Sequence, residues 1–244
     1  MTVSADPPRL EQTPTGPTPT GPMPTDPTPA GATPPGVAPS SLAERAYTGL
    51  RDDIITLRLQ PGATLVEEAL MARLAVGRTP LREALKRLQT ERLVTIYPRR
   101  GTFVAEVNLT DHSLISDVRR QLEGLAAERA AERATATDRD AFAELVTAVD
   151  RHPGGRLPGM QLDTRIHRAV HRASRNGYLE ADLTNYYNLS LRIWYLFLDR
   201  LPEVDHRAEH RPMLQAVLSG DAATAARYAR DHVDHFERAV RAIL

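Results

Sequence analysis

The stretch from residue 41 to residue 108 constrains the fold of this chain more than any other part of the sequence. The helical spacing of its apolar residues predicts three short helices, over about 42–57, 66–74 and 78–91. Two short runs of β type, LVTIYP and GTFVAEV, come next, and Pro98 and Gly101 frame the turn between them. Three short helices followed by a hairpin indicate a winged helix-turn-helix domain over residues 41–108.

The residues before this stretch have a different composition. Residues 1–40 hold 12 of the 19 prolines and eight threonines, and they offer almost nothing apolar to bury. Because proline removes backbone hydrogen-bond donors, we expect a disordered Pro/Thr-rich tail over residues 1–40. Order is expected to begin at Ser41, since Ser41 and Glu44 have the spacing of a capping box.

Beyond residue 108 the sequence carries helical signals and no strand signal. The expected helices lie near 110–135, 138–151, 159–175, 178–199, 205–219 and 221–243. Apolar stripes such as Leu114, Val118, Leu122 and Leu125 suit the core of a helical bundle. The predicted fold is therefore mainly α, with an N-terminal winged helix-turn-helix and a C-terminal all-α domain over residues 109–244.

The charges balance over the whole chain but are uneven along it. The chain has 31 basic and 31 acidic residues, yet residues 76–105 hold seven basic residues against two acidic ones. Positive charge is therefore concentrated on the third helix and the hairpin, which is the electrostatic footprint of a DNA-binding face.

Three further features concern the compartment in which the chain works. It has no cysteine, so it can form neither a disulfide nor a thiolate metal ligand. The first 40 residues lack the apolar core of a signal peptide, and the apolar run over residues 193–198 is far too short to span a bilayer. These features favour a cytoplasmic protein with no membrane partner.

The third helix has two distinct faces. Leu81, Leu85 and Leu88 form an apolar stripe, while Arg78 and Arg82 fall on the opposite face. Two arginines one turn apart can read guanine or clamp phosphates, although the same pattern also suits a solvated basic surface.

The segment from LRLQPGATL to RRGTFVAEV resembles the DNA-binding domain of the GntR family of bacterial transcription regulators. The resemblance rests on the Pro61-Gly62 turn, the RTPLREAL helix and the RRGTFV wing. The residues that it assigns to DNA contact are Arg78, Thr79 and Arg82 in the helix, and Arg100 and Gly101 in the minor groove at the wing tip. The sequence departs from the family pattern at Ala75, where glycine is usual, and at Gly77, where a Ser or Thr cap is usual. Such a domain implies a homodimer bound to a pseudo-palindromic DNA operator.

A second group of polar residues lies in the all-α region. Asp163, His167 and His171 follow one another at four-residue steps, which places them on one side of a helix. Asp163 and His167 flank an apolar stripe, and His210 and His232 fall in register with inward-facing positions of their own helices. One carboxylate and three imidazoles make a first-row metal site plausible. A solvated polar stripe, or core histidines without a metal, would give the same spacing.

The all-α region resembles the FCD ligand-binding domain of FadR-type GntR regulators. The resemblance rests on VRRQLEGLAAERAA, the DxxxH of residues 163–167, and the later histidines. It implies a divalent metal, favouring zinc, nickel or manganese over calcium, at Asp163, His167, His210 and His232. We interpret His171 as a solvated residue and His235 as a residue behind the ligands.

The resemblance also places Arg119 toward the metal, where it could bind a small carboxylate effector. Arg119 could equally pair with Glu123, four residues on. The sequence as a whole predicts a ligand-responsive DNA-binding regulator, and the resemblance implies a repressor. A regulator that senses the metal itself is the alternative. A metal-dependent enzyme is disfavoured, because we find no dedicated general base or nucleophile motif and an enzyme would not need the basic wing.

Overall fold

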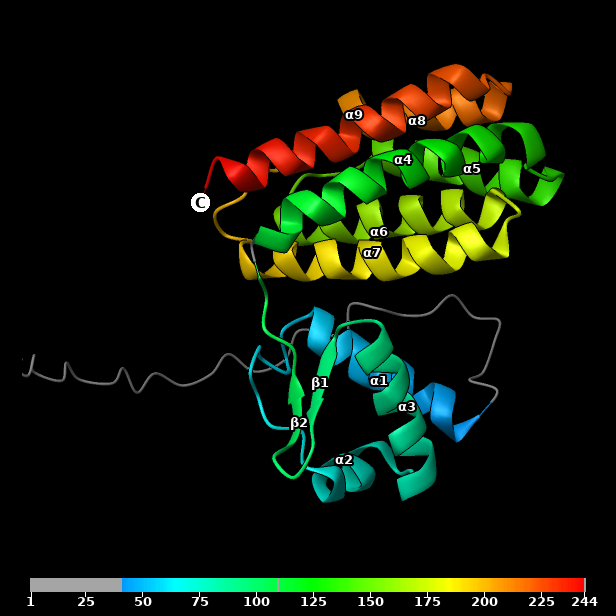
Figure 1. Ribbon diagram of the computed structural model, residues 1–244. Helices are drawn as coiled ribbons and strands as arrows, with labels where there is room; N and C mark the ends of the chain where they lie inside the picture. Colours follow the sequence, from blue (N-terminus) through cyan, green and yellow to red (C-terminus); the bar gives the residue numbers. More distant parts are fainter. Residues whose placement is uncertain (1–40, 109, 244) are drawn as a thin grey trace, which may run out of the picture. The chain divides into compact units, whose positions relative to one another are not determined.

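The computed structural model describes residues 41–108 and 110–243 of the chain (Figure 1). The tail expected over residues 1–40 lies outside the described residues. The described residues are helical apart from loops and one two-stranded antiparallel sheet, so the predicted mainly α fold is confirmed.

The first part of the described chain has the order helix, helix, helix, strand, strand. Its elements are α1 (Leu42–Ile55), α2 (Glu67–Leu74), α3 (Arg78–Thr90), β1 (Val94–Tyr97) and β2 (Gly101–Val104). The strands pair antiparallel, with Val94 opposite Val104 and Tyr97 opposite Gly101. Buried apolar side chains from these elements share one core, which includes Leu50, Ile54, Leu70, Leu81, Leu85, Leu88, Val94 and Val104. This is the winged helix-turn-helix that the sequence predicts.

Local interactions explain where α1 and α3 begin. Ser41 Oγ accepts a hydrogen bond from Glu44 N at 3.1 Å, as an N-cap does. The predicted capping box is only half formed, because the Glu44 carboxylate pairs with Arg87 of α3 at 2.9 Å. At α3, Gly77 holds the N-cap position without a side-chain bond, and Pro80 occupies the first turn, where its missing N–H does no harm.

The turn between α2 and α3 contains a residue in a left-handed backbone conformation. Ala75 ends α2 with φ 50° and ψ 51°, and its N–H bonds back to the carbonyls of Met71 and Ala72. This conformation brings Cβ close to a carbonyl oxygen, a strain of about 1–2 kcal/mol that glycine avoids. Ala75 therefore adopts a strained conformation at a position where the glycine usual in the family would adopt it without strain.

Replacing Ala75 by glycine should stabilise the DNA-binding domain. The relief of left-handed strain outweighs the extra entropy of glycine in the unfolded chain, which leaves a gain of up to about 1 kcal/mol. Urea unfolding measures the change. Ala72→Gly is the matched control, because Ala72 lies exposed inside α2 and should lose about 1 kcal/mol. Equal losses in the two variants would contradict the strain.

The described residues from 110 to 243 form a bundle of six helices. They are α4 (Thr110–Arg133), α5 (Ala136–Asp150), α6 (Arg156–Ala173), α7 (Gly177–Leu196), α8 (His206–Ser219) and α9 (Ala222–Arg241). All lie within a few residues of the predicted positions. α4 is the central helix, since it packs against α6, α7, α8 and α9 (Figure 1). None of the described helices combines the length and apolar character needed to cross a membrane.

The expectation for the first helix of the bundle is wrong at two positions. Leu114 is 62% exposed and Val118 is 40% exposed, whereas Leu122 and Leu125 pack against the core as expected. The buried face of α4 carries polar residues instead, namely His112, Ser116, Arg119 and Glu123. The reason is that this face lines a polar interior, described below, so apolar periodicity points the wrong way there.

Candidate functional site

The structure places the three candidate DNA-contacting residues of α3 on one exposed surface. Arg78, Thr79 and Arg82 are exposed, while Leu81 and Leu85 on the other side of the helix are buried in the core. The amphipathic pattern therefore leaves the N-terminal part of α3 free to approach DNA.

Glu67, at the start of α2, holds both arginines in this structure. Its carboxylate lies 3.0 Å from Arg82 Nε and 3.8 Å from Arg78 Nε. No sequence signal points to Glu67, because its partners lie on another helix and no spacing rule connects them. Any DNA group that contacted either guanidinium would have to compete with Glu67.

The hairpin places the other two candidate residues at its tip. Pro98, Arg99 and Arg100 form the turn between the strands, and Gly101 begins β2. Arg99, Arg100 and Gly101 are all exposed. Arg99 and Gly101 adopt positive φ angles of 62° and 110°. Arg100 N donates a hydrogen bond to Tyr97 O at 3.2 Å, which closes the turn. This tight turn presents basic side chains on a narrow support, as insertion into a minor groove requires.

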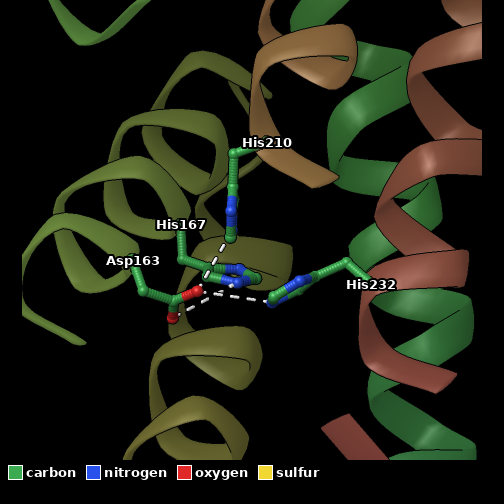
Figure 2. A group of neighbouring side chains, drawn as sticks. All are labelled: Asp163, His167, His210 and His232. Atoms are coloured by element: carbon green, nitrogen blue, oxygen red, sulfur yellow. Dashed lines mark ion pairs between the residues drawn. The ribbon is translucent and has the colours of Figure 1, made fainter. Parts of the chain in front are cut away.

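A second candidate site lies inside the bundle, where four side chains from three helices converge (Figure 2). Asp163 and His167 come from α6, His210 from α8 and His232 from α9, and all four are buried. Asp163 Oδ1 lies 3.0 Å from His210 Nε2 and 3.3 Å from His232 Nε2. Asp163 Oδ2 lies 3.7 Å from His167 Nε2. The structure thus brings together the four residues that the sequence singled out as metal ligands.

The chemistry of these residues fits a metal ion. Among the described residues, Asp163 Oδ1, His167 Nε2 and His210 Nε2 have no partner of hydrogen-bond geometry, although all three atoms are buried. Buried polar atoms without partners destabilise a fold by about 1–3 kcal/mol each. Three imidazole nitrogens and one carboxylate are a ligand set typical of a divalent first-row metal. A metal would satisfy all of these atoms at once.

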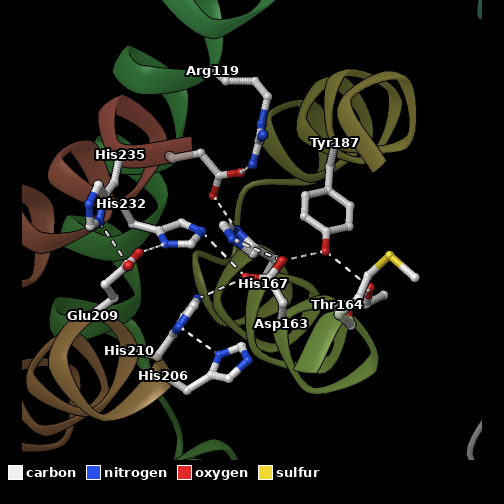
Figure 3. A network of polar contacts seen from close by, with 12 residues as sticks. Arg119, Asp163, Thr164, His167, Tyr187, His206, Glu209, His210, His232 and His235 are labelled. Atoms are coloured by element: carbon white, nitrogen blue, oxygen red, sulfur yellow. Dashed lines mark hydrogen bonds and ion pairs between the residues drawn. The ribbon is translucent and has the colours of Figure 1, made fainter. Parts of the chain in front are cut away.

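In each of the three ligand histidines, the second ring nitrogen, Nδ1, contacts a side chain outside the ligand set (Figure 3). The partners of the Nδ1 atoms are Glu123 Oε2 for His167 (3.1 Å), Glu209 Oε2 for His232 (2.6 Å) and His206 Nδ1 for His210 (3.1 Å). Such outer contacts orient histidine ligands and leave Nε2 for the metal. The sequence indicated Glu123 only as a possible partner of Arg119. It gave no indication of Glu209.

The charged groups of this centre shift one another's pKa values. Burial raises the pKa of Asp163, but the surrounding histidines, His167 foremost, outweigh burial and hold it well below its usual range. Burial and the neighbouring His232 lower the pKa of His210 to about 4. Burial lowers the pKa of His232 as well, but Asp163 and Glu209 outweigh it and raise the pKa to about 9. A metal that binds here therefore displaces a proton from His232.

The interpretation of the remaining histidines needs one correction. His171 is not solvated but only 1% exposed, and its Nε2 lies 2.8 Å from Glu123 Oε2. Spacing alone could not show this, because the partner lies on α4. His235 is exposed and lies behind the centre, with its Nδ1 2.8 Å from Glu209 Oε1. His206 is also buried, and it lies beside His210.

A pocket adjoins the metal-ligand cluster. Its lining includes Arg119, Asp163, Tyr187, Ser190, Leu191, Trp194, Val204, His232 and Phe236. Tyr187 Oη donates to Asp163 Oδ2 at 2.7 Å. Arg119 lines this pocket and also pairs with Glu123 at 2.9 Å, so the two readings of Arg119 from the sequence are not exclusive.

Comparison with known proteins identifies both parts of the chain. Residues 42–104 match the family "Bacterial regulatory proteins, gntR family", and residues 114–235 match the "FCD domain". The HTH-type transcriptional repressor GlaR of Escherichia coli K12 is 31% identical over 199 residues, which cover 77% of this chain and 90% of GlaR. The chain belongs to the GntR family. Its GntR and FCD domains give it the FadR-type architecture, and it is a DNA-binding transcription regulator rather than an enzyme.

Solved structures agree with this GntR fold. Escherichia coli McbR/YncC superimposes with a TM-score of 0.69 at 20% identity, over 83% of this chain and 98% of McbR. A putative GntR regulator from Rhodococcus sp. RHA1 superimposes with a TM-score of 0.63 at 21% identity, with the same coverage. At these identities the likeness concerns the fold alone.

Proposed function

We propose that this GntR regulator is a repressor whose operator binding is controlled by a small carboxylate bound beside a divalent metal. In this proposal Asp163, His167, His210 and His232 hold zinc, nickel or manganese, and Arg119 binds the effector. The observation that carries the proposal is the convergence of ligand atoms without partners at the edge of the pocket that Arg119 lines.

The chemistry of the pocket supports a carboxylate effector. Three neutral imidazoles and one carboxylate leave a divalent ion with net positive charge, which attracts an anionic effector. Arg119 Nε is buried and has no hydrogen-bond partner among the described residues. A guanidinium is suited to bind a carboxylate through two N–H groups. Trp194 and Phe236 give the pocket apolar walls, which favour an effector with an apolar part.

The proposal assigns DNA binding to residues 41–108 and effector binding to residues 109–244. DNA contact is assigned to Arg78, Thr79, Arg82, Arg100 and Gly101. We further propose a homodimer on a pseudo-palindromic operator, since reading such a site needs two recognition helices. The exposed Leu114 and Val118 on α4 support a protein–protein contact. The name of GlaR as a repressor supports the repressor role.

A two-stage experiment tests this function. Operator sequences are first selected from random duplex DNA, and the zinc-loaded protein is screened by thermal shift against a library of small carboxylates. We expect a carboxylate that raises the melting temperature only when zinc is present, that weakens operator binding, and whose effect is reduced in Arg119→Met. The operator complex should contain two chains. A response to zinc alone would favour the metal sensor instead, and no response to either would overturn the proposal.

A further inference from the structure

The carboxylate of Glu123 lies between Arg119 and two histidines, just outside the proposed ligand set. Glu123 Oε1 accepts a hydrogen bond from Arg119 Nη2 at 2.9 Å. Glu123 Oε2 lies 3.1 Å from His167 Nδ1 and 2.8 Å from His171 Nε2. All four side chains are buried, so the pairing of each donor and acceptor matters for stability.

These contacts determine which nitrogen of His167 carries a proton. A neutral imidazole has one N–H and one lone pair, and an ionised carboxylate can only accept. Glu123 forms an ion pair with the buried Arg119 guanidinium at 2.9 Å, which favours the ionised carboxylate. His167 must therefore donate from Nδ1, which leaves the lone pair on Nε2, the atom that faces Asp163.

We propose that Glu123 is a positioning residue, which fixes the His167 tautomer able to bind metal through Nε2, and that Arg119 in turn fixes the orientation of Glu123. The proposal rests on the metal centre proposed above. Arg119, which is assigned to the effector, and His167, which is assigned to the metal, therefore both contact the carboxylate of Glu123.

Glu123 could in principle be a ligand itself, since Glu123, His167 and His171 also lie close enough together to hold an ion. Two observations argue against this. The Arg119 guanidinium already lies 2.9 Å from the carboxylate, so a second cation there would be repelled. His167 would also have to offer its lone pair at Nδ1, which places the proton on Nε2 and removes the lone pair from the atom that faces Asp163.

The substitution Glu123→Gln tests the proposal. The Arg119 side chain carries donors and no acceptor, so the amide oxygen of Gln must face Arg119. The amide N–H groups then face His167 and His171, and each histidine must accept. His167 is thereby driven to the tautomer with a proton on Nε2, which cannot bind the metal.

Glu209 supplies a matched comparison on the other side of the centre. Its carboxylate also bridges two histidines, His232 at 2.6 Å and His235 at 2.8 Å. Here the outer partner is an exposed histidine that can accept as well as donate. In Glu209→Gln the amide can therefore turn its oxygen to His232 and its N–H to His235, and the tautomer of His232 is kept.

We expect Glu123→Gln to weaken zinc binding by about 10- to 100-fold, the range found when outer contacts of ligand histidines are lost. Glu209→Gln should lose much less. Competition with a chromophoric chelator measures both affinities. In chelator-treated protein labelled with ¹⁵N-histidine, NMR should show His167 protonated on Nδ1 in the wild type and on Nε2 in Glu123→Gln. The His167 signals are assigned from their absence in His167→Gln.

A double variant separates this role from mere damage to the fold. In Arg119→Met with Glu123→Gln, the amide oxygen is free to face His167, so zinc affinity should return toward that of Arg119→Met alone. An unchanged tautomer in Glu123→Gln, or a loss of affinity that the second change does not restore, would overturn the proposal. If the wild type bound no zinc, the proposed metal centre would be refuted. The tautomer measurement would still show whether Glu123 fixes the proton on His167 Nδ1.

Discussion

Replacing His210 by alanine should abolish stoichiometric zinc binding and the stabilisation that zinc gives to the wild-type protein. His210 is fully buried, and its Nε2 lies 3.0 Å from Asp163 Oδ1, so the change removes one of the four proposed ligand atoms from the centre. Zinc that binds only the folded state stabilises the wild type by about 2.7 kcal/mol at a free concentration 100 times Kd. Melting curves with and without zinc, together with elemental analysis, measure the difference.

The control for this variant is His235→Ala. It makes the same change at an exposed position behind the centre and should keep the zinc response. His171→Ala is less suitable, because His171 contacts Glu123. If wild-type protein purified without chelator held no stoichiometric metal, and zinc, nickel and manganese all left its melting curve unchanged, the four residues would be only a polar interior.

Replacing Arg82 by alanine should weaken operator binding by about 1–3 kcal/mol, as expected when an arginine that reads a base is lost. Arg78→Ala should have an effect of the same order, because both side chains project from one exposed face of α3. Neither change removes a buried group, so the melting temperature should stay close to that of the wild type. Fluorescence anisotropy with the selected operator at near-physiological salt measures the affinity.

Arg227→Ala provides the comparison for a lost positive charge. The Arg227 side chain is 58% exposed and that of Arg82 is 59% exposed, and each pairs with an acidic residue. Arg227 lies on α9 in the helical bundle, so its loss should leave operator affinity unchanged. Wild-type affinity in both Arg78→Ala and Arg82→Ala would refute the assignment of α3 as the reading helix.

The sequence predicted those parts of the molecule in which apolar periodicity and burial agree. The two faces of α3 were predictable, because Leu81 and Leu85 pack into an ordinary core while Arg78 and Arg82 face solvent. The same reasoning placed His210 and His232 inward, because apolar residues share their faces.

Periodicity failed where the protein buries polar groups. Along α4 the polar residues Arg119 and Glu123 are buried, while Leu114 and Val118, the first two positions of the expected apolar stripe, are exposed. His171 was misread for a related reason, since its partner Glu123 lies 48 residues away in sequence. Spacing rules relate residues of one helix, and these contacts join different helices.

The pairing of Glu67 with the arginines of α3 bears on how long the regulator stays on the wrong DNA. A surface ion pair of this kind contributes about 0–1 kcal/mol. In the proposed mode of DNA binding, an arginine on a non-cognate site can remain with Glu67 and add nothing to binding, whereas on the operator it would leave Glu67 for a better partner. The difference amounts to less than tenfold in dissociation rate for each arginine. Over many random encounters along a genome, that factor lets the protein leave incorrect sites sooner and search faster.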